Sequence, residues 1–131
     1  MRARRNPISA LWSAYGRLRG LLTLNITTAN STVDITMNFK EFHASLSQPT
    51  PPQGMSDALT ALWLDANGQW EAAHDQVRDN SDQPSAWVHA YLHHVEGVLW
   101  NADYWYGRAK KKRPGCTTRE EWQQIAQSLL D

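Results

Sequence analysis

The stretch ALWLDANGQWEAA, residues 61–73, and the stretch AYLHHVEGVLWNA, residues 90–102, are two copies of one pattern. In both copies an alanine opens the stretch, a glycine stands at its eighth position and an alanine closes it. Small residues let two helices approach closely, and glycine forms the turn between them. Each copy therefore predicts a helical hairpin, and the repetition predicts that the two hairpins stack on one another.

Apolar residues around each copy recur with the period of an α-helix. The first hairpin is expected over about residues 56–79, with its turn at Gly68. The second is expected over about residues 84–109, with its turn at Gly97 and a return helix that ends before the basic run at 110–113. Helices joined by so few residues pack antiparallel.

Two further helices are expected outside the hairpins. Asn38, with Glu41 three residues later, is typical of a capping box that starts a short helix. The sequence TTREE at residues 117–121 offers a capping box in either of two registers, ahead of a helix with one apolar side. The sequence thus predicts an all-α fold of about five helices: two stacked hairpins, a short N-terminal helix and a closing C-terminal helix.

The first 36 residues differ from the rest in charge. They carry five arginines and one acidic residue, whereas residues 37–131 carry eight basic and twelve acidic residues. Arg17 and Arg19 interrupt the apolar run in this segment, which argues against a secretory signal or a membrane span. We expect residues 1–36 to be an extension, either disordered, an over-long gene start or a targeting segment, and residues 37–131 to form a single α-helical domain.

Charge and cysteine content exclude several classes of function. The excess of acidic residues in 37–131 argues against a general nucleic-acid-binding protein. The single cysteine, Cys116, excludes an internal disulfide and a cluster of thiolate metal ligands. The expected location is the cytoplasm, and the protein is not expected to bind a membrane.

The first copy contains Gly68-x-Trp70-x-x-Ala73, which resembles the core of tetratricopeptide and Sel1-like repeats, although the unit is shorter. This resemblance implies stacked hairpins that bind an extended partner on a surface of successive helices. The stretches WVHAYLHHVEG, residues 87–97, and NADYWYGRA, residues 101–109, also resemble a group of small bacterial proteins of unknown function. That second resemblance implies no activity.

Histidines and a glutamate form a ridge on the expected helix 85–96. His89, His93 and Glu96 are spaced at i, i+4 and i+7, so they share one side of the helix, and His74 on the preceding helix can approach them. Such histidines can bind zinc, but the glutamate does not stand between them as in H-E-x-x-H, and no fourth ligand is evident. The ridge is therefore a buried polar layer, the lining of a ligand groove, or a metal or acid–base site.

The expected helix 99–109 is apolar nearly all round, which predicts a central, buried position. If it were exposed instead, Trp100, Asn101, Tyr104 and Arg108 would form a strip suited to a peptide or ligand. The cations at residues 110–113 are expected to be a solvated helix end.

These observations favour a non-enzymatic module that binds a protein or peptide, with no catalytic residue, cofactor or metal ligand assigned. Its expected binding residues are His89, His93, Glu96, Trp100, Asn101, Tyr104 and Arg108. The alternative is a small metal-dependent or acid–base enzyme that uses His74 together with the histidine and glutamate ridge. A homodimer that covers the aromatic strip is a third hypothesis.

Overall fold

The structure is a computed structural model that describes residues 37–130. Every regular element in that range is helical, so the predicted all-α class is confirmed, with six α-helices where about five were expected. The elements are α2 (Phe39–Ala44), a short 3₁₀ helix η1 (Ser45–Ser47), α3 (Asp57–Ala66), α4 (Trp70–Val77), α5 (Gln83–Glu96), α6 (Leu99–Arg108) and α7 (Thr118–Leu130). The interpretations made for residues 1–36 lie outside the described residues.

Side-chain caps begin the helices at both ends of the described chain. The Asn38 side chain accepts a hydrogen bond from the Glu41 backbone N–H at 2.8 Å, and the Glu41 carboxylate accepts one from the Asn38 N–H at 3.1 Å. Thr117 and Glu120 make the same reciprocal pair, both at 3.1 Å. Of the two possible registers in TTREE, the chain therefore uses this one, which leaves Glu121 available to the protein interior.

Glycines make the turns of both hairpins. Gly68 has φ 79° and Gly97 has φ 90°, a left-handed backbone that L side chains rarely adopt. The Gly97 N–H bonds back to the carbonyl of His93, which closes α5, and α6 starts two residues later. As predicted, α3 packs on α4 and α5 packs on α6.

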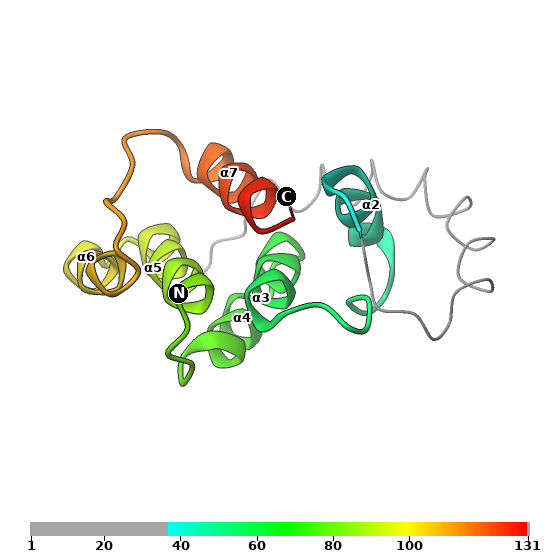
Figure 1. The fold of residues 1–131 in the computed structure, drawn as a ribbon, viewed down its shortest axis with the longest axis horizontal. Coiled ribbons are helices and arrows are strands. Elements are labelled where there is room, and N and C mark those ends of the chain that lie inside the picture. The colour runs from blue at the N-terminus through cyan, green and yellow to red at the C-terminus, as the bar shows by residue number, and fades with distance from the viewer. Residues whose placement is uncertain (1–36, 131) are drawn as a thin grey trace.

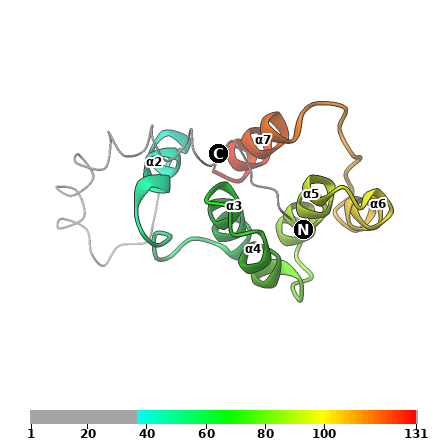
Figure 2. The ribbon, with the colours of Figure 1, turned by 180° about the vertical axis from the view of Figure 1, so that it is seen from behind.

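The central helix is α5. In Figures 1 and 2, α5 lies between α6 and the hairpin of α3 and α4, with α7 on one side, and α6 stands at the edge of the molecule. The prediction that helix 99–109 is central and buried is therefore wrong. Its apolar side chains are spread around its circumference, but α5 is its main neighbour, so only Ala102 and Tyr106 within α6 are buried.

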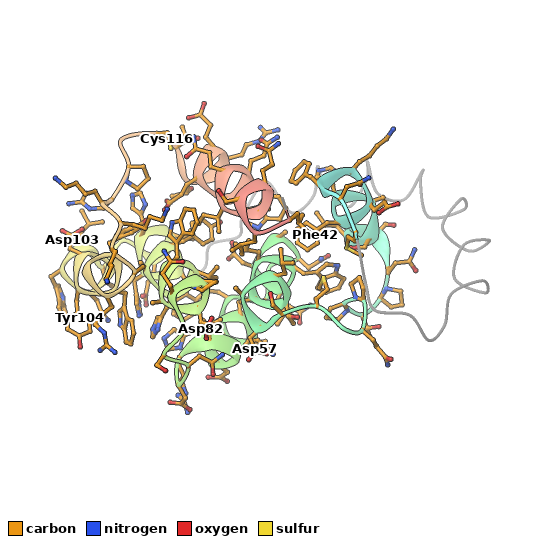
Figure 3. The ribbon with its side chains drawn as sticks, in the orientation of Figure 1. Phe42, Asp57, Asp82, Asp103, Tyr104 and Cys116 are labelled. Carbon is orange, nitrogen blue, oxygen red and sulfur yellow. The ribbon has the colours of Figure 1, made fainter. Side chains whose placement is uncertain are left out.

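The main apolar core lies among α2, α3, α5 and α7. Phe42 points from α2 toward α3 and α7 (Figure 3) and stacks on Trp122, with ring centroids 5.7 Å apart. Two buried indoles are hydrogen-bonded across elements: Trp63 donates to the carbonyl of Ser45 at 3.2 Å, and Trp122 to that of Leu62 at 2.9 Å. These contacts join α2, η1, α3 and α7 into one apolar layer.

Exposed apolar side chains are concentrated on α6. In the described part of the chain, the large apolar side chains that stand exposed are Leu99, Trp100 and Tyr104, and all three belong to α6. No helix between residues 37 and 130 combines the length and the apolar character needed to cross a membrane.

Candidate metal centre between α4 and α5

Three of the five histidines meet where α4 packs against α5. The Nε2 atoms of His74 and His89 are 3.0 Å apart. One nitrogen from each of His74, His89 and His93 lies within 4.8 Å of the other two. His89 and His93 are buried, and His74 is half-buried. The helical spacing of His89 and His93 therefore does place both imidazoles on the side of α5 that faces α4.

Two tryptophans hold the imidazoles in place. Trp70 stacks on His74, with centroids 5.0 Å apart and planes 8° from parallel, and its indole N–H donates to the Leu92 carbonyl at 2.8 Å. That bond fixes the start of α4 to α5. On the other side, Trp105 of α6 stacks on His89 at 4.0 Å. The cluster is thus enclosed by side chains from three helices.

Burial lowers the pKa values of two of these histidines. Burial, followed by the nearby His74 and His93, lowers the pKa of His89 to about 3. Burial and His93 lower the pKa of His74 as well. A neutral imidazole has a free lone pair on one nitrogen, and this is the form that binds metal ions.

His93 is oriented by its partners. Its Nδ1 lies 2.9 Å from Oε1 of Glu96, and its Nε2 lies 3.3 Å from the amide nitrogen of Asn101. With the Nδ1–H donating to the carboxylate, Nε2 carries the lone pair and accepts from the Asn101 amide, a bond that a metal on Nε2 would replace. A carboxylate behind a histidine is the usual support for a metal ligand. In this arrangement, Glu96 orients His93 and is not one of the three grouped side chains.

His89 has one ring nitrogen without a hydrogen-bond partner. Its Nδ1 is buried and has no hydrogen-bond partner, which makes it exceptional among the described side chains. An unsatisfied buried polar atom costs about 1–3 kcal/mol. This atom is not the Nε2 that faces His74, but the other nitrogen of the same ring.

His94, the next residue after His93, belongs to a separate polar group that is satisfied. Its Nδ1 lies 2.8 Å from Oε1 of Glu121, and the Tyr106 hydroxyl lies 3.3 Å from that nitrogen. Tyr106 also donates to Oε2 of Glu121. Glu121 is only 2 % exposed, yet both of its oxygens are bonded. We call these three residues the His94–Glu121 group.

The structure divides the predicted binding residues into two places. His89, His93, Glu96 and Asn101 meet at the junction of α4, α5 and α6. Trp100, 75 % exposed, does not join them. Tyr104 and Arg108 lie on the exposed rim of α6, where Figure 3 shows Tyr104 on a different side of the helix from Asp103. The predicted binding residues therefore lie in two separate places, a histidine cluster and an exposed rim of α6.

Sequence reasoning missed the side chains around the cluster. Trp105 is four residues after Asn101, so helical spacing already placed the two on one side of α6. Glu121 stands beside Trp122 and on the apolar side of α7, and an acidic residue at such a position signals a buried partner.

No family model, curated protein or solved structure shows a significant match to this chain. The tetratricopeptide and Sel1-like resemblance therefore remains a prediction from sequence.

Proposed function

We propose that this protein binds a divalent transition metal, with zinc the best fit, through His74, His89 and His93. The observation that carries the proposal is the convergence of three imidazole nitrogens within 4.8 Å. Tetrahedral zinc with bonds of about 2.0–2.1 Å holds neighbouring nitrogens roughly 3.3 Å apart. The 3.0 Å separation of His74 and His89 is close to that spacing. A separation of 4.8 Å must close by about 1.5 Å to match the ligand spacing of such a site.

Three protein ligands would leave one coordination position of the metal for water or substrate. Between residues 37 and 130, no other histidine, cysteine, aspartate or glutamate joins these three. Structural zinc sites use four protein ligands, whereas catalytic sites use three and keep one position for water or substrate. The proposal therefore favours the metal-dependent alternative drawn from the sequence, in which a metal-bound water has a lowered pKa.

The ligand type also supports the choice of metal. Imidazole nitrogens suit zinc, copper, nickel and cobalt, while magnesium and calcium prefer oxygen. Cys116, on the connection between α6 and α7 (Figure 3), is not part of the group. Thiolate ligation is therefore not part of the proposal.

Equilibrium dialysis of the full chain tests the proposal. Metal-stripped protein is dialysed against Zn²⁺ and, separately, Mg²⁺. We expect about one zinc and no magnesium per chain. His89→Ala is expected to lose the zinc, whereas His94→Gln, which removes the neighbouring imidazole and can still bond Glu121, is expected to keep it. Wild-type protein without zinc, or equal zinc in wild type and folded His89→Ala, would overturn the proposal.

A second candidate function, binding of an acidic peptide, is supported by the rim of α6. The exposed Leu99, Trp100 and Tyr104 lie on the helix whose end carries Arg108 and residues 110–112, all exposed cations. Aromatic residues with arginine are typical of protein interfaces, and the positive end complements acidic side chains.

Fluorescence anisotropy with labelled peptides tests this second function. Wild type is expected to bind a Glu-rich peptide with a central Phe in preference to its Lys-rich counterpart, and Trp100→Ala is expected to lose that preference. Equal binding of both peptides would exclude it. Sedimentation of the protein alone separately tests the homodimer hypothesis.

A further inference from the structure

Asn101, in the first turn of α6, contacts one of the three clustered histidines. Its amide nitrogen lies 3.3 Å from Nε2 of His93, and its side chain is half-buried. Because the Nδ1–H of His93 donates to Glu96, Nε2 accepts the bond from the amide. This bond therefore ends on the same lone pair that a metal would take, and Asn101 borders the position of a metal bound to that nitrogen.

The turn at Gly97 places Asn101 opposite His93. These two residues stand four positions on either side of Gly97, and His89 and Trp105 stand eight positions on either side. An antiparallel helical hairpin brings such pairs together. Both pairs are in contact, since the Asn101 amide bonds to His93 and the Trp105 ring stacks on His89. One side of α6 therefore faces both α5 histidines of the cluster.

The first hairpin has no polar pair at the equivalent positions. Leu64 and Ala72 stand there, four positions on either side of Gly68. A hairpin of this kind thus forms with apolar side chains at both places. The bond between Asn101 and His93 is therefore specific to the second hairpin, and the turn itself does not require it.

The distance between Asn101 and His93 fits two ligands of one metal. Tetrahedral zinc with bonds of about 2.0–2.2 Å holds neighbouring ligand atoms roughly 3.3 Å apart. The Asn101 amide nitrogen already lies 3.3 Å from Nε2 of His93. A half-turn of the amide about its last side-chain bond exchanges this nitrogen with Oδ1, which has the lone pairs of a ligand. Once a metal takes the lone pair of Nε2, the nitrogen has lost its acceptor, whereas the oxygen gains a bond to the metal.

We propose that Asn101 is the fourth protein ligand of the metal centre, through Oδ1. This inference rests on the proposed metal function. Carbonyl oxygens suit magnesium, calcium and manganese, whereas imidazoles suit zinc, so the amide bond is the weakest of the four. Water or substrate then enters by replacing this oxygen, and all three imidazoles stay bound.

Cobalt-loaded full-length protein tests the ligand assignment. Co²⁺ replaces zinc in histidine sites and gives visible absorption bands that depend on its ligands. With Asn101 on the metal, we expect these bands to stay constant between about pH 6 and about pH 9, because no metal-bound water ionises. In Asn101→Ala a water takes the place of the amide, and its ionisation near about pH 7 is expected to shift the bands. Saturating imidazole is expected to give both proteins the same bands, because it takes the same position in each.

Two further variants provide the controls. Asn101→Asp places a carboxylate oxygen at the same position and is expected to restore bands that do not change with pH. Asn80→Ala removes a half-buried asparagine that bonds to Asp57 and is expected to behave like wild type.

The outcomes separate the inference from the metal site on which it rests. Wild-type bands that shift with pH as those of Asn101→Ala do would overturn the inference but leave the metal site intact. Wild-type bands that do not respond to imidazole would contradict the replacement of the amide. Absence of cobalt bands in wild type would overturn the proposed function itself.

Discussion

Two adjacent histidines of α5, His93 and His94, belong to two polar groups that differ in how completely their polar atoms are hydrogen-bonded. On the α7 side, every described contact is satisfied: Glu121 bonds both to a ring nitrogen of His94 and to the Tyr106 hydroxyl. On the α4 side, two imidazoles contact each other and one buried nitrogen has no partner. The comparison teaches that burial alone does not define a structural role, since only the first group satisfies its polar atoms.

The energetic consequences of the two groups differ. In the His94–Glu121 group, burial and Glu121 raise the pKa of Tyr106 far above its usual range, so the hydroxyl stays protonated and donates. A buried charge with complete partners is costly to disrupt. In the His74–His89–His93 cluster, Nδ1 of His89 is buried without a partner, and an apolar residue of similar shape would remove that cost. The proposed metal binding gives a reason for histidines at these positions.

The largest expected change in the free energy of unfolding concerns the His94–Glu121 group. Glu121→Ala removes the shared partner of His94 and Tyr106, and we expect the free energy of unfolding to fall by about 3 kcal/mol in urea titrations. Zinc stoichiometry of the remaining folded protein is expected to be unchanged. Loss of zinc without loss of stability would show that the two groups have been assigned the wrong roles.

For the His74–His89–His93 cluster, we expect a substitution to lower zinc affinity without lowering stability. His89→Leu replaces the unsatisfied imidazole with an apolar side chain, so zinc affinity is expected to fall at least about a hundredfold, or ~2.7 kcal/mol. Metal-free stability is expected to remain unchanged or to rise by up to about 1 kcal/mol. Competition with a chromophoric chelator measures the first quantity, and thermal melts with a chelator measure the second. A strongly destabilised metal-free variant would assign His89 to packing.

A smaller effect is expected at the residue that orients His93. Glu96→Gln retains the size of the side chain but weakens its bond to Nδ1, and such supporting residues change metal affinity by about 10–100-fold. We expect about a tenfold loss of zinc affinity with little change in melting temperature, because the Glu96 side chain is partly exposed. Full zinc affinity in this variant would show that the carboxylate has no role in orienting the ligand.

The comparison extends to the α3 side of α5, where Tyr91 donates to Asp65 at 2.7 Å. Burial raises the pKa of Asp65 to about 6, against the bond to Tyr91, which lowers it. The folded protein therefore holds this proton more tightly than the unfolded chain, and stability is lost as pH rises through about 6.

Asp65→Asn removes this ionisation while keeping an oxygen that accepts from Tyr91. Relative to wild type, the variant is expected to gain about 3 kcal/mol above pH 7 and little below the unfolded pKa of 3.8, as measured by urea titration at each pH. A difference that does not change with pH would contradict the raised pKa.

Much of the fold was predictable because it depends on local chemistry. Helical periodicity, the cap at Asn38 and the turn glycines Gly68 and Gly97 fix where helices begin and end. The number of neighbours around each helix is not local. An apolar circumference favoured burial of helix 99–109, but α6 packs mainly against one helix, and Trp100 faces solvent.

The candidate site was predictable only in part, for the same reason. Spacing placed His89 and His93 on one side of α5 and directed His94 elsewhere. Helical spacing could not identify the partners of these histidines. Glu121, the partner of His94, lies 27 residues further along the chain, and Trp105, which stacks on His89, belongs to the helix that was wrongly expected to be central. Such partners depend on tertiary packing, which the periodicity of one helix does not encode.

X-ray absorption at the zinc edge of the loaded full-length protein tests the metal assignment most directly. Three imidazole ligands at about 2.0–2.1 Å and at least one further nitrogen or oxygen ligand are expected. A sulfur ligand at about 2.3 Å, or fewer than three imidazoles, would contradict a centre built from His74, His89 and His93.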